Sequence, residues 1–368
     1  MFIGKIDYTT SKQSFNGCFV TLAEKNLGKE TAKNVVEVFN KKIFPQLSPE
    51  ISPLSDTTNF FALAAGAGTR FKISHLVGDY NKVNMPLTPE TETVHMLDFL
   101  LALAKPFMNK KGAVPLMQHS SNGSFGGVVD YYLSGKPVKD TIVCSADSIF
   151  GSDSKNLIEF FKKSISDKKV HLAVIGGQRT PQEVVGRYGV LDLKKADENY
   201  LLKKFVEKPE LPIAQKYAEN GQDAVNTGFY YISKDAMINL LNEIKSGNNP
   251  IKRNDTEIYD FGLTIKYVHS QYQKWFGKKA AQCVSVKLSP SWEDVGEAQG
   301  FYSLMKKLKQ GEYLHNFPQG LSEKVQNDLS QRVHLDSHIP YINFSPNSRV
   351  SLAQIKNAQT IDGVKIIV

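Results

Sequence analysis

The sequence predicts an α/β protein in which helices pack against a mainly parallel β-sheet. Short apolar runs of the kind that form buried parallel strands occur at residues 60–64, 141–144 and 171–175. Helical patterns lie between these runs, at residues 91–104 and 157–165. Strands that alternate with helices favour a parallel sheet covered by helices. Such a sheet binds ligands at the carboxyl ends of its strands.

The chain divides into three parts where the sequence pattern changes. Residues 1–58 form an N-terminal extension with a predicted amphipathic helix at 29–44, followed by a stretch rich in proline and serine. Residues 59–300 contain the alternating strands and helices and form the expected core. Residues 301–368 form a short C-terminal segment that begins with a predicted helix and ends with a predicted strand at 364–368. We expect this last segment to be a candidate surface for assembly.

The overall composition is that of an ordinary globular protein. The 368 residues are 41% hydrophobic and 22% charged, which excludes disordered, collagen-like and coiled-coil proteins. Lys and Arg number 45 against 37 Asp and Glu, a formal charge of +8 that suits an anionic partner. The basic residues are spread along the chain without a block of the kind found in nucleic-acid-binding tails, so we expect no nucleic-acid partner.

Cysteine usage and apolar runs indicate the compartment. Cys18, Cys144 and Cys283 are far apart and form no Cys-x-x-Cys pair, which excludes a disulfide framework or a cysteine-rich zinc site. The first residues lack the apolar region of a secretory signal. The strongest apolar run, 99–104, is far shorter than the roughly 20 residues of a spanning helix. We therefore expect a cytoplasmic protein with no membrane partner.

A glycine-rich loop directly follows the predicted strand at 60–64. Residues 63–70 read Leu-Ala-Ala-Gly-Ala-Gly-Thr-Arg. Small residues let the backbone N–H groups approach a phosphate, and Arg70 adds a cation suited to phosphate oxygens. The loop lacks the Gly-Lys-Ser/Thr ending of a P-loop, and Phe71 stands where the dinucleotide fingerprint needs its third glycine. A phosphate-binding loop and a plain tight turn both fit these residues.

This loop, with segment 82–87 (Lys-Val-Asn-Met-Pro-Leu), resembles the signature of the sugar-1-phosphate nucleotidyltransferases, also called nucleotide-sugar pyrophosphorylases. The resemblance implies a Rossmann-like, three-layer α/β sandwich. It implies catalytic roles for Arg70 and Lys82. Lys72 is the alternative to Lys82, because Val83 replaces the Pro or Ala that often follows the lysine in this family. The nucleotide-binding residues that the resemblance implies are Leu63, Ala64, Ala65, Gly66, Gly68, Thr69, Gln118 and Gly123.

Further segments match the family in its own order along the chain. Residues 205–209 read Phe-Val-Glu-Lys-Pro, a close match to a family motif. Segment 187–191 resembles the family's Tyr-Gly-Val segment, and segment 225–230 resembles its Asn-x-Gly-x-Tyr/Phe strand. A carboxylate accepts hydrogen bonds from sugar hydroxyls, and an ammonium group binds phosphate as a point charge. The sugar-1-phosphate-binding residues that the resemblance implies are Gly189, Glu207, Lys208 and Asn226, with Lys208 also catalytic.

Two acids lie in segments that resemble the family's metal-binding motifs. Residues 143–147 are similar to a strand ending in Gly-Asp, with Ala146 in place of the glycine. Residues 292–296, Trp-Glu-Asp-Val-Gly, are similar to the family's Trp-x-Asp-Val-Gly. The resemblance implies that Asp147 and Asp294 bind Mg²⁺, for which carboxylate oxygens are suitable ligands. The structural alternatives are an aspartate that caps a turn and a buried tryptophan beside a turn.

The implied reaction joins a nucleoside triphosphate to a sugar 1-phosphate and releases pyrophosphate. The segment around residues 205–229 is similar to the mannose-1-phosphate guanylyltransferases, which favours GTP with mannose 1-phosphate over UTP or ATP with glucose 1-phosphate. Another class remains open, a non-catalytic regulatory relative that binds nucleotide-sugars. A glycosyltransferase is the third alternative, but no Asp-x-Asp motif follows the predicted strand that ends near Asp147. C-terminal segments of relatives often mediate assembly, which makes a homo-oligomer a candidate state.

Overall fold

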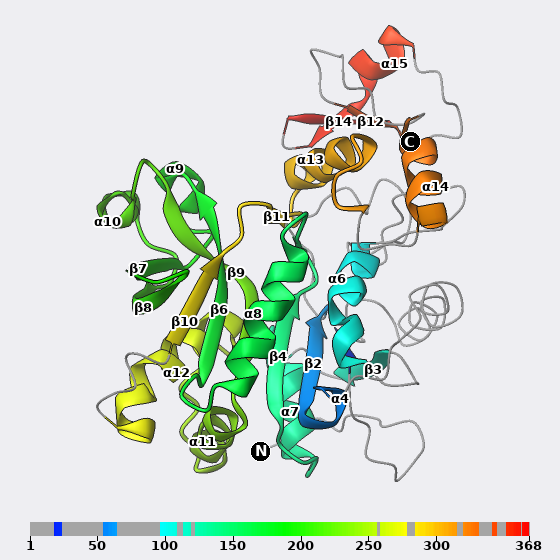
Figure 1. Ribbon diagram of the computed structural model, residues 1–368. Helices are drawn as coiled ribbons and strands as arrows, with labels where there is room; N and C mark the ends of the chain where they lie inside the picture. Colours follow the sequence, from blue (N-terminus) through cyan, green and yellow to red (C-terminus); the bar gives the residue numbers. More distant parts are fainter. Residues whose placement is uncertain are drawn as a thin grey trace.

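The computed structural model describes most of the chain as an α/β protein (Figure 1). The described residues are 18–23, 54–64, 96–108, 113–118, 122–255, 258–277, 284–314, 319–330, 341–343, 351–361 and 363–367. Across these ranges the strands form one nine-stranded sheet, one two-stranded sheet and one three-stranded sheet. None of the helices in these ranges has the length and apolar character needed to cross a lipid bilayer.

The large sheet has two halves with different strand directions. Its first half consists of parallel neighbours, in the order β3 (Ala113–Gln118), β1 (Cys18–Ala23), β2 (Thr58–Leu63) and β4 (Asp140–Ser145). The second half continues with β9 (Asp223–Ile232), β6 (Leu172–Arg179), β10 (Val284–Leu288), β8 (Asn199–Val206) and β7 (Val190–Ala196). In this half only β6 and β10 are parallel neighbours.

The expectation of a mainly parallel sheet is therefore correct for the first half and wrong for the second. The antiparallel strand β9 lies between β4 and β6. It runs antiparallel to both of these neighbours. Val190 of β7 also pairs with Val225 of β9, which closes the pairings of β9, β6, β10, β8 and β7 into a ring. The fold is a mixed α/β structure.

The expected boundary between residues 58 and 59 also needs correction. Strand β1 lies inside the large sheet, between β3 and β2, and so residues 18–23 belong to the core. Phe19 and Val20 point to opposite faces of the sheet, and each is only 1% exposed. A strand buried on both faces stabilises the core rather than an extension. The predicted helix at 29–44 lies outside the described residues.

Helices cover both faces of the large sheet, giving three layers. Along β4, Ile142 and Cys144 belong to the hydrophobic core on one face, and Val143 belongs to the core on the other. The first core contains α6 (Met96–Ala104), α8 (Ser154–Ser166) and α13 (Ala298–Lys309). The second contains α7 (Gly126–Leu133), α11 (Lys234–Lys245) and α12 (Phe261–Phe276). The three strands predicted first and the helix at 157–165 are confirmed, and α6 covers the described part of the helix predicted at 91–104.

The C-terminal part packs against α13 (Figure 1). After α13 come α14 (Gln319–Ser330), β12 (Tyr341–Asn343), α15 (Leu352–Asn357), β13 (Gln359–Ile361) and β14 (Val364–Ile367). The strands form the small sheet β12-β14-β13, and Val364 and Ile366 of β14 join the same hydrophobic core as Phe301 of α13. The helix and the final strand predicted for this part are confirmed as α13 and β14.

Asp223, at the start of β9, carries a pH-dependent prediction. It is fully buried, and neither carboxylate oxygen has a hydrogen-bond partner among the described residues. Burial raises its pKa from 3.8 to about 6. A folded-state pKa above the unfolded value means that protonation favours folding, so stability falls as pH rises from about 4 to about 6 and stays low above it. At pH 7.5 we expect Asp223→Asn to raise the free energy of unfolding by about 1–2 kcal/mol.

Urea denaturation at pH 7.5 and at pH 4 checks this expectation. At pH 4 the gain should shrink toward zero, because Asp223 is then largely protonated in the folded wild-type protein. Asp192→Asn is the matched control. Asp192 is ion-paired with Lys203 at 2.6 Å, and this pair should stabilise the folded state slightly at pH 7.5. We therefore expect Asp192→Asn to lower the free energy of unfolding slightly at this pH. A gain for Asp223→Asn of the same size at both pH values would contradict the prediction.

Candidate active site at the carboxyl edge of the sheet

A cavity of about 230 Å³ lies at the carboxyl end of β4. Residues just before β7 and just after β8 line it, and so does Asn226 of β9. Its walls include side chains from β9, from the loops around the strand ends and from the N-terminus of α12. The sequence-predicted residues that line it are Asp147, Gly189, Glu207, Lys208, Asn226 and Asp294. The fold thus brings together every predicted metal-binding and sugar-phosphate-binding residue, from segments up to 147 positions apart.

The two predicted metal-binding acids are joined through a small pair of strands. Asp147 directly precedes β5 (Ser148–Ile149), which pairs antiparallel with β11 (Glu293–Asp294). Asp294 lies opposite Ser148, and the Val295 N–H donates to the Asp147 carbonyl oxygen at 3.0 Å. The backbone therefore fixes the two aspartates next to each other at the rim of the cavity.

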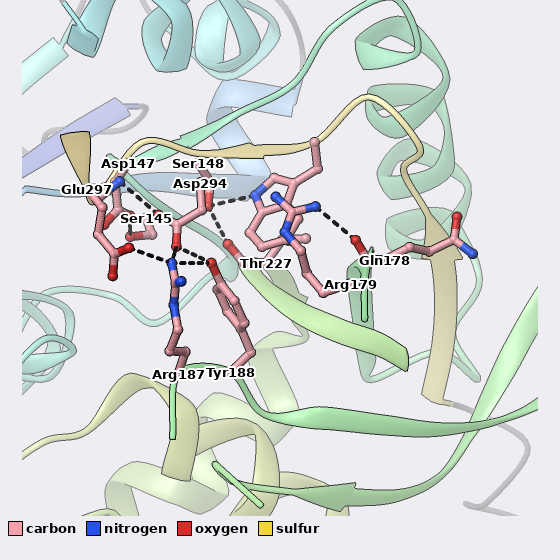
Figure 2. Close-up of polar contacts among 12 residues, drawn as sticks. Ser145, Asp147, Ser148, Gln178, Arg179, Arg187, Tyr188, Thr227, Asp294 and Glu297 are labelled. Carbon is pink, nitrogen blue, oxygen red and sulfur yellow. Dashed lines mark hydrogen bonds and ion pairs between the residues drawn. The ribbon is translucent and has the colours of Figure 1, made fainter. Parts of the chain in front are cut away.

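Each of these carboxylates is oriented by neighbouring donors (Figure 2). The Ser145 hydroxyl donates to Asp147 Oδ1, and the Gly296 N–H donates to Asp294 Oδ1 at 2.8 Å. The Tyr188 hydroxyl donates to Asp294 Oδ2 at 2.5 Å. Burial, followed by the charge of Asp294, raises the pKa of Tyr188, so the phenol stays protonated and donates.

The chemistry of this donor set fits Mg²⁺. No group of three or more His, Cys, Asp or Glu side chains with the spacing of a metal site occurs in the described ranges. Two neighbouring carboxylates suit Mg²⁺, which typically binds one or two protein carboxylates and completes its shell with water and substrate phosphates. An ionised carboxylate has about four acceptor positions, so the hydrogen bonds named above leave capacity on both acids.

Gly189 and Asn226 shape the wall opposite the acids. A Cβ atom at Gly189 would lie 2.3 Å from Phe205 Cζ and 3.0 Å from Glu207 Oε2, so only glycine fits there. The Asn226 N–H donates to the Gly189 carbonyl oxygen at 2.8 Å. A β-bulge in β9 follows at Thr227 and Gly228, where Gly228 has a φ of +79°. The bulge redirects β9 at the point where Asn226 lines the cavity.

Lys208 is a cation at the cavity wall. It follows Glu207 at the end of β8 and precedes the buried Pro209. Its φ of +44° places it in the left-handed region, which is uncommon for a residue with a side chain and is typical of constrained functional positions. Its side chain is exposed, and within the described ranges its ammonium group has no hydrogen bond or ion pair to another residue.

Arg253 is a second cation in the cavity wall. It lies in the turn after α11 and donates to Glu207 Oε1 at 2.6 Å and to Asp260 Oδ2 at 2.7 Å. Asp260 in turn caps α12, since its Oδ1 accepts from the Leu263 N–H at 2.7 Å. Burial opposes the charge of Arg253, but its bonds to Asp260 and Glu207 outweigh burial and raise its pKa. Arg253 therefore fixes the Glu207 carboxylate.

The predicted nucleotide-binding residues are described only in part. Leu63 ends β2, and its carbonyl oxygen accepts from the Ala146 N–H at 3.1 Å, while the Ala64 N–H donates to the Thr21 carbonyl oxygen at 3.0 Å. The first residue of the glycine loop is therefore hydrogen-bonded through its backbone to the segment that holds Asp147. The other predicted residues of this region lie outside the described residues: Ala65, Gly66, Gly68, Thr69, Arg70 and Lys82.

Gln118 and Gly123 belong to a neighbouring part of the same edge. Gln118 ends β3, and its backbone pairs with Ala23 of β1, but its side chain is outside the described part of the chain. Gly123 has a φ of +94°, and a Cβ atom there would lie 2.6 Å from the Tyr259 carbonyl oxygen. Gly123 therefore lets its loop pass close to the chain before α12, and Ser124 beside it lines the cavity.

Comparison with known protein families agrees with this arrangement. The family model described as nucleotidyl transferase matches residues 104–311, which is more than half of the chain. The chain belongs to the nucleotidyl transferase family. The matched region begins at the end of α6 and ends just after α13, so it contains the cavity and both aspartates.

Individual members and structures of this kind are distant from the chain. The glucose-1-phosphate adenylyltransferase 2 of Vibrio parahaemolyticus is 26% identical over 201 residues, which is 52% of this chain. The chain matches 45% of the length of that curated relative. Among solved structures, a mannose-1-phosphate geranyltransferase from Thermus thermophilus has 18% identity and a TM-score of 0.45, covering 68% of this chain and 78% of that one. A UDP-glucose pyrophosphorylase complexed with UDP-glucose has 16% identity and a TM-score of 0.42, covering 80% and 99%.

The structure reveals two residues of the candidate site that the sequence motifs did not single out. Arg253 and Asp260 both line the cavity, although neither stands in a motif identified from the sequence. The only local signal is Asp260, which directly precedes the amphipathic helix α12 as an N-cap residue does. The partner of Arg253 is Glu207, 46 positions earlier, and no local pattern reveals such a pair.

The Arg253 bridge predicts a large loss of stability when it is removed. Arg253→Ala leaves Glu207 and Asp260 without their shared partner, and the side chains of these acids are only 14% and 5% exposed. We expect the free energy of unfolding to fall by about 2–3 kcal/mol, measured by urea denaturation. Arg253→Lys should recover only part of this loss, because one ammonium group cannot reproduce the planar fork.

Lys252→Ala provides the matched control for this prediction. Lys252 is the neighbouring cation, and its ion pair with Asp255 is on the surface. Its removal should change the free energy of unfolding by less than about 1 kcal/mol. Equal small losses for Lys252→Ala and Arg253→Ala would show that the bridge does not hold the site together.

Proposed function

We propose that this protein transfers a nucleotidyl group from a nucleoside triphosphate to a hexose 1-phosphate. The observation that carries the proposal is the cavity, which joins two adjacent aspartates to Glu207, Lys208 and Arg253. One end of this cavity suits a cation and phosphates, and the other suits sugar hydroxyls and a single phosphate. The start of the glycine loop lies beside the aspartates, where a triphosphate would be bound.

The reaction that fits this cavity forms one bond at the α-phosphorus and breaks another. A phosphate oxygen of the sugar 1-phosphate attacks, and the bond from the α-phosphorus to the bridging oxygen breaks, releasing pyrophosphate. The attacking oxygen is already anionic near neutral pH, so no general base is needed. The main requirement is to bring two anions together in the correct geometry.

The residues of the cavity meet this requirement in distinct ways. Lys208 binds and orients the phosphate of the sugar 1-phosphate. Glu207, fixed by Arg253, accepts hydrogen bonds from sugar hydroxyls, and Asn226 contributes a further polar contact. Asp147 and Asp294 would hold Mg²⁺, which when bound supplies positive charge next to the reacting phosphates. Arg70 and Lys82 remain predicted ligands of the triphosphate and of the leaving pyrophosphate.

GTP with mannose 1-phosphate is the substrate pair that we favour. The support is the similarity of segment 205–229 to the mannose-1-phosphate guanylyltransferases. The second candidate is glucose 1-phosphate with ATP or UTP. Its support is that the curated relative with 26% identity is named a glucose-1-phosphate adenylyltransferase.

A pyrophosphate-release assay tests the proposal. The purified protein is incubated with Mg²⁺, each of the four common ribonucleoside triphosphates and a panel of hexose 1-phosphates. The corresponding hexose 6-phosphates serve as matched controls, because they carry the same charge but no anomeric phosphate. We expect release that requires both substrates, with the largest rate for GTP and mannose 1-phosphate. Binding of a nucleotide-sugar without release from any pair would instead identify a non-catalytic, regulatory relative.

A further inference from the structure

Asp294 is held by a hydrogen-bonded chain that runs through Tyr188 and Arg187, which also line the cavity, to Glu297, which does not (Figure 2). Tyr188 donates to its Oδ2 at 2.5 Å, and Arg187 Nη2 donates to the Tyr188 hydroxyl at 3.3 Å. The same guanidinium nitrogen lies 4.0 Å from Asp294 Oδ2 and 3.0 Å from Glu297 Oε2. One cation thus links the phenol, the aspartate and a second acid.

The Tyr188 ring is held rigidly, so its hydroxyl has a defined position. The residue is 8% exposed, and its ring meets the edge of Trp292 at a centroid distance of 5.5 Å and an angle of 78°. Trp292 is fixed in turn, because its Nε1 donates to the Ser148 hydroxyl at 3.2 Å. The indole packs against Gly177, where a Cβ atom would come within 2.1 Å of Trp292 Cε3.

The other end of the chain is the first turn of helix α13. Glu297 is the N-cap residue of α13 and binds Arg187 through its side chain. In the same turn, a Cβ atom at Gly300 would lie 1.9 Å from the Asp294 carbonyl oxygen. The helix therefore packs directly on the backbone of Asp294, while Tyr188 holds the side chain. Arg187 connects these two supports.

We propose that Tyr188 and Arg187 are positioning residues for Asp294, which they hold in the orientation that binds a divalent cation and tie to the start of α13. The inference rests on the proposed metal-binding role of Asp294. Partners that orient a metal ligand typically contribute a factor of about 10–100 in metal affinity. Tyr188 contacts no reacting atom in this account and acts only through Asp294.

The test is the affinity for Mn²⁺ alone, measured by electron paramagnetic resonance on the full chain. We expect Tyr188→Phe to bind Mn²⁺ about tenfold more weakly than the wild type. Arg187→Met leaves the phenol in place and should weaken binding less, by about threefold, so it provides a second test if Tyr188→Phe folds poorly. Tyr231→Phe is the matched control: it also removes a bond from a buried phenol to an aspartate, at 3.3 Å from Asp140, and should leave Mn²⁺ affinity unchanged.

Turnover separates positioning from a merely structural role. Raising the Mg²⁺ concentration should restore most of kcat in Tyr188→Phe but not in Asp294→Asn. Wild-type Mn²⁺ affinity in both Tyr188→Phe and Arg187→Met, with weak binding in Asp294→Asn, would overturn the inference and leave the proposed function intact. Wild-type affinity in Asp294→Asn would overturn the metal-binding role itself, and the inference with it.

Discussion

The Asp147→Asn variant is expected to lose a factor of about 10²–10³ in kcat while remaining folded. Asp147 is a half-buried residue at the carboxyl edge of the sheet, and its Oδ1 already accepts a hydrogen bond from Ser145. The amide keeps the size of the side chain but removes the negative charge that would hold Mg²⁺ beside the phosphates. Steady-state pyrophosphate release at saturating Mg²⁺ and substrates measures the effect.

Asp192→Asn is the control for this variant. Asp192 lies in β7, is ion-paired with Lys203 and does not line the cavity. It should retain wild-type turnover, and both variants should show circular dichroism spectra like that of the wild type. Turnover of folded Asp147→Asn within a few-fold of the wild type would remove Asp147 from the catalytic site.

The second large effect is expected for Lys208→Ala, in the use of the sugar 1-phosphate. We expect kcat/KM for the sugar 1-phosphate to fall by about 10²-fold or more, because the variant loses the cation that we propose brings the attacking phosphate into place. The free energy of unfolding should change by less than about 0.5 kcal/mol, since the side chain is exposed and makes no bond to other described residues. Initial rates over a range of both substrate concentrations measure these parameters.

Lys204→Ala is the matched control, because Lys204 is an exposed lysine of β8, four residues before Lys208. It removes the same formal charge outside the cavity and should leave the kinetics unchanged. If Lys204→Ala and Lys208→Ala lower kcat/KM equally, the effect comes from general charge and the specific role of Lys208 is wrong.

The sequence predicts the parts of the fold that depend on local patterns. The apolar runs that become β2, β4 and β6 are buried on both faces, and this is why they are visible without the structure. Strand β1 was not predicted, because its place between β3 and β2 depends on pairing with residues about 40 and 95 positions away. The antiparallel direction of β9 was not predicted for the same reason, since β9 pairs with residues of β4 that lie 85 to 91 positions earlier.

The candidate site shows the same division between local and distant signals. Family motifs point to Glu207, Lys208, Asn226 and both aspartates, and these residues line one cavity. The contact between Asp147 and the Asp294 strand depends on the pairing of Asp294 with Ser148, 146 positions apart, which the motifs alone do not give. The Glu207–Arg253 bridge and the chain from Tyr188 through Arg187 to Glu297 are tertiary contacts without a sequence pattern. They are visible only where the folded strands and turns meet.

The most direct test of the proposed transfer is to follow complete reaction mixtures by phosphorus-31 nuclear magnetic resonance. The first mixture contains the purified protein, Mg²⁺, GTP and mannose 1-phosphate. Further mixtures contain ATP or UTP with glucose 1-phosphate in place of these substrates. We predict equal growth of the signals of a diphosphate-linked nucleotide-sugar and of pyrophosphate, and growth of both signals about 10²–10³-fold more slowly in the Asp147→Asn sample. Substrate signals that stay unchanged in every mixture containing folded wild-type protein would contradict the transfer reaction.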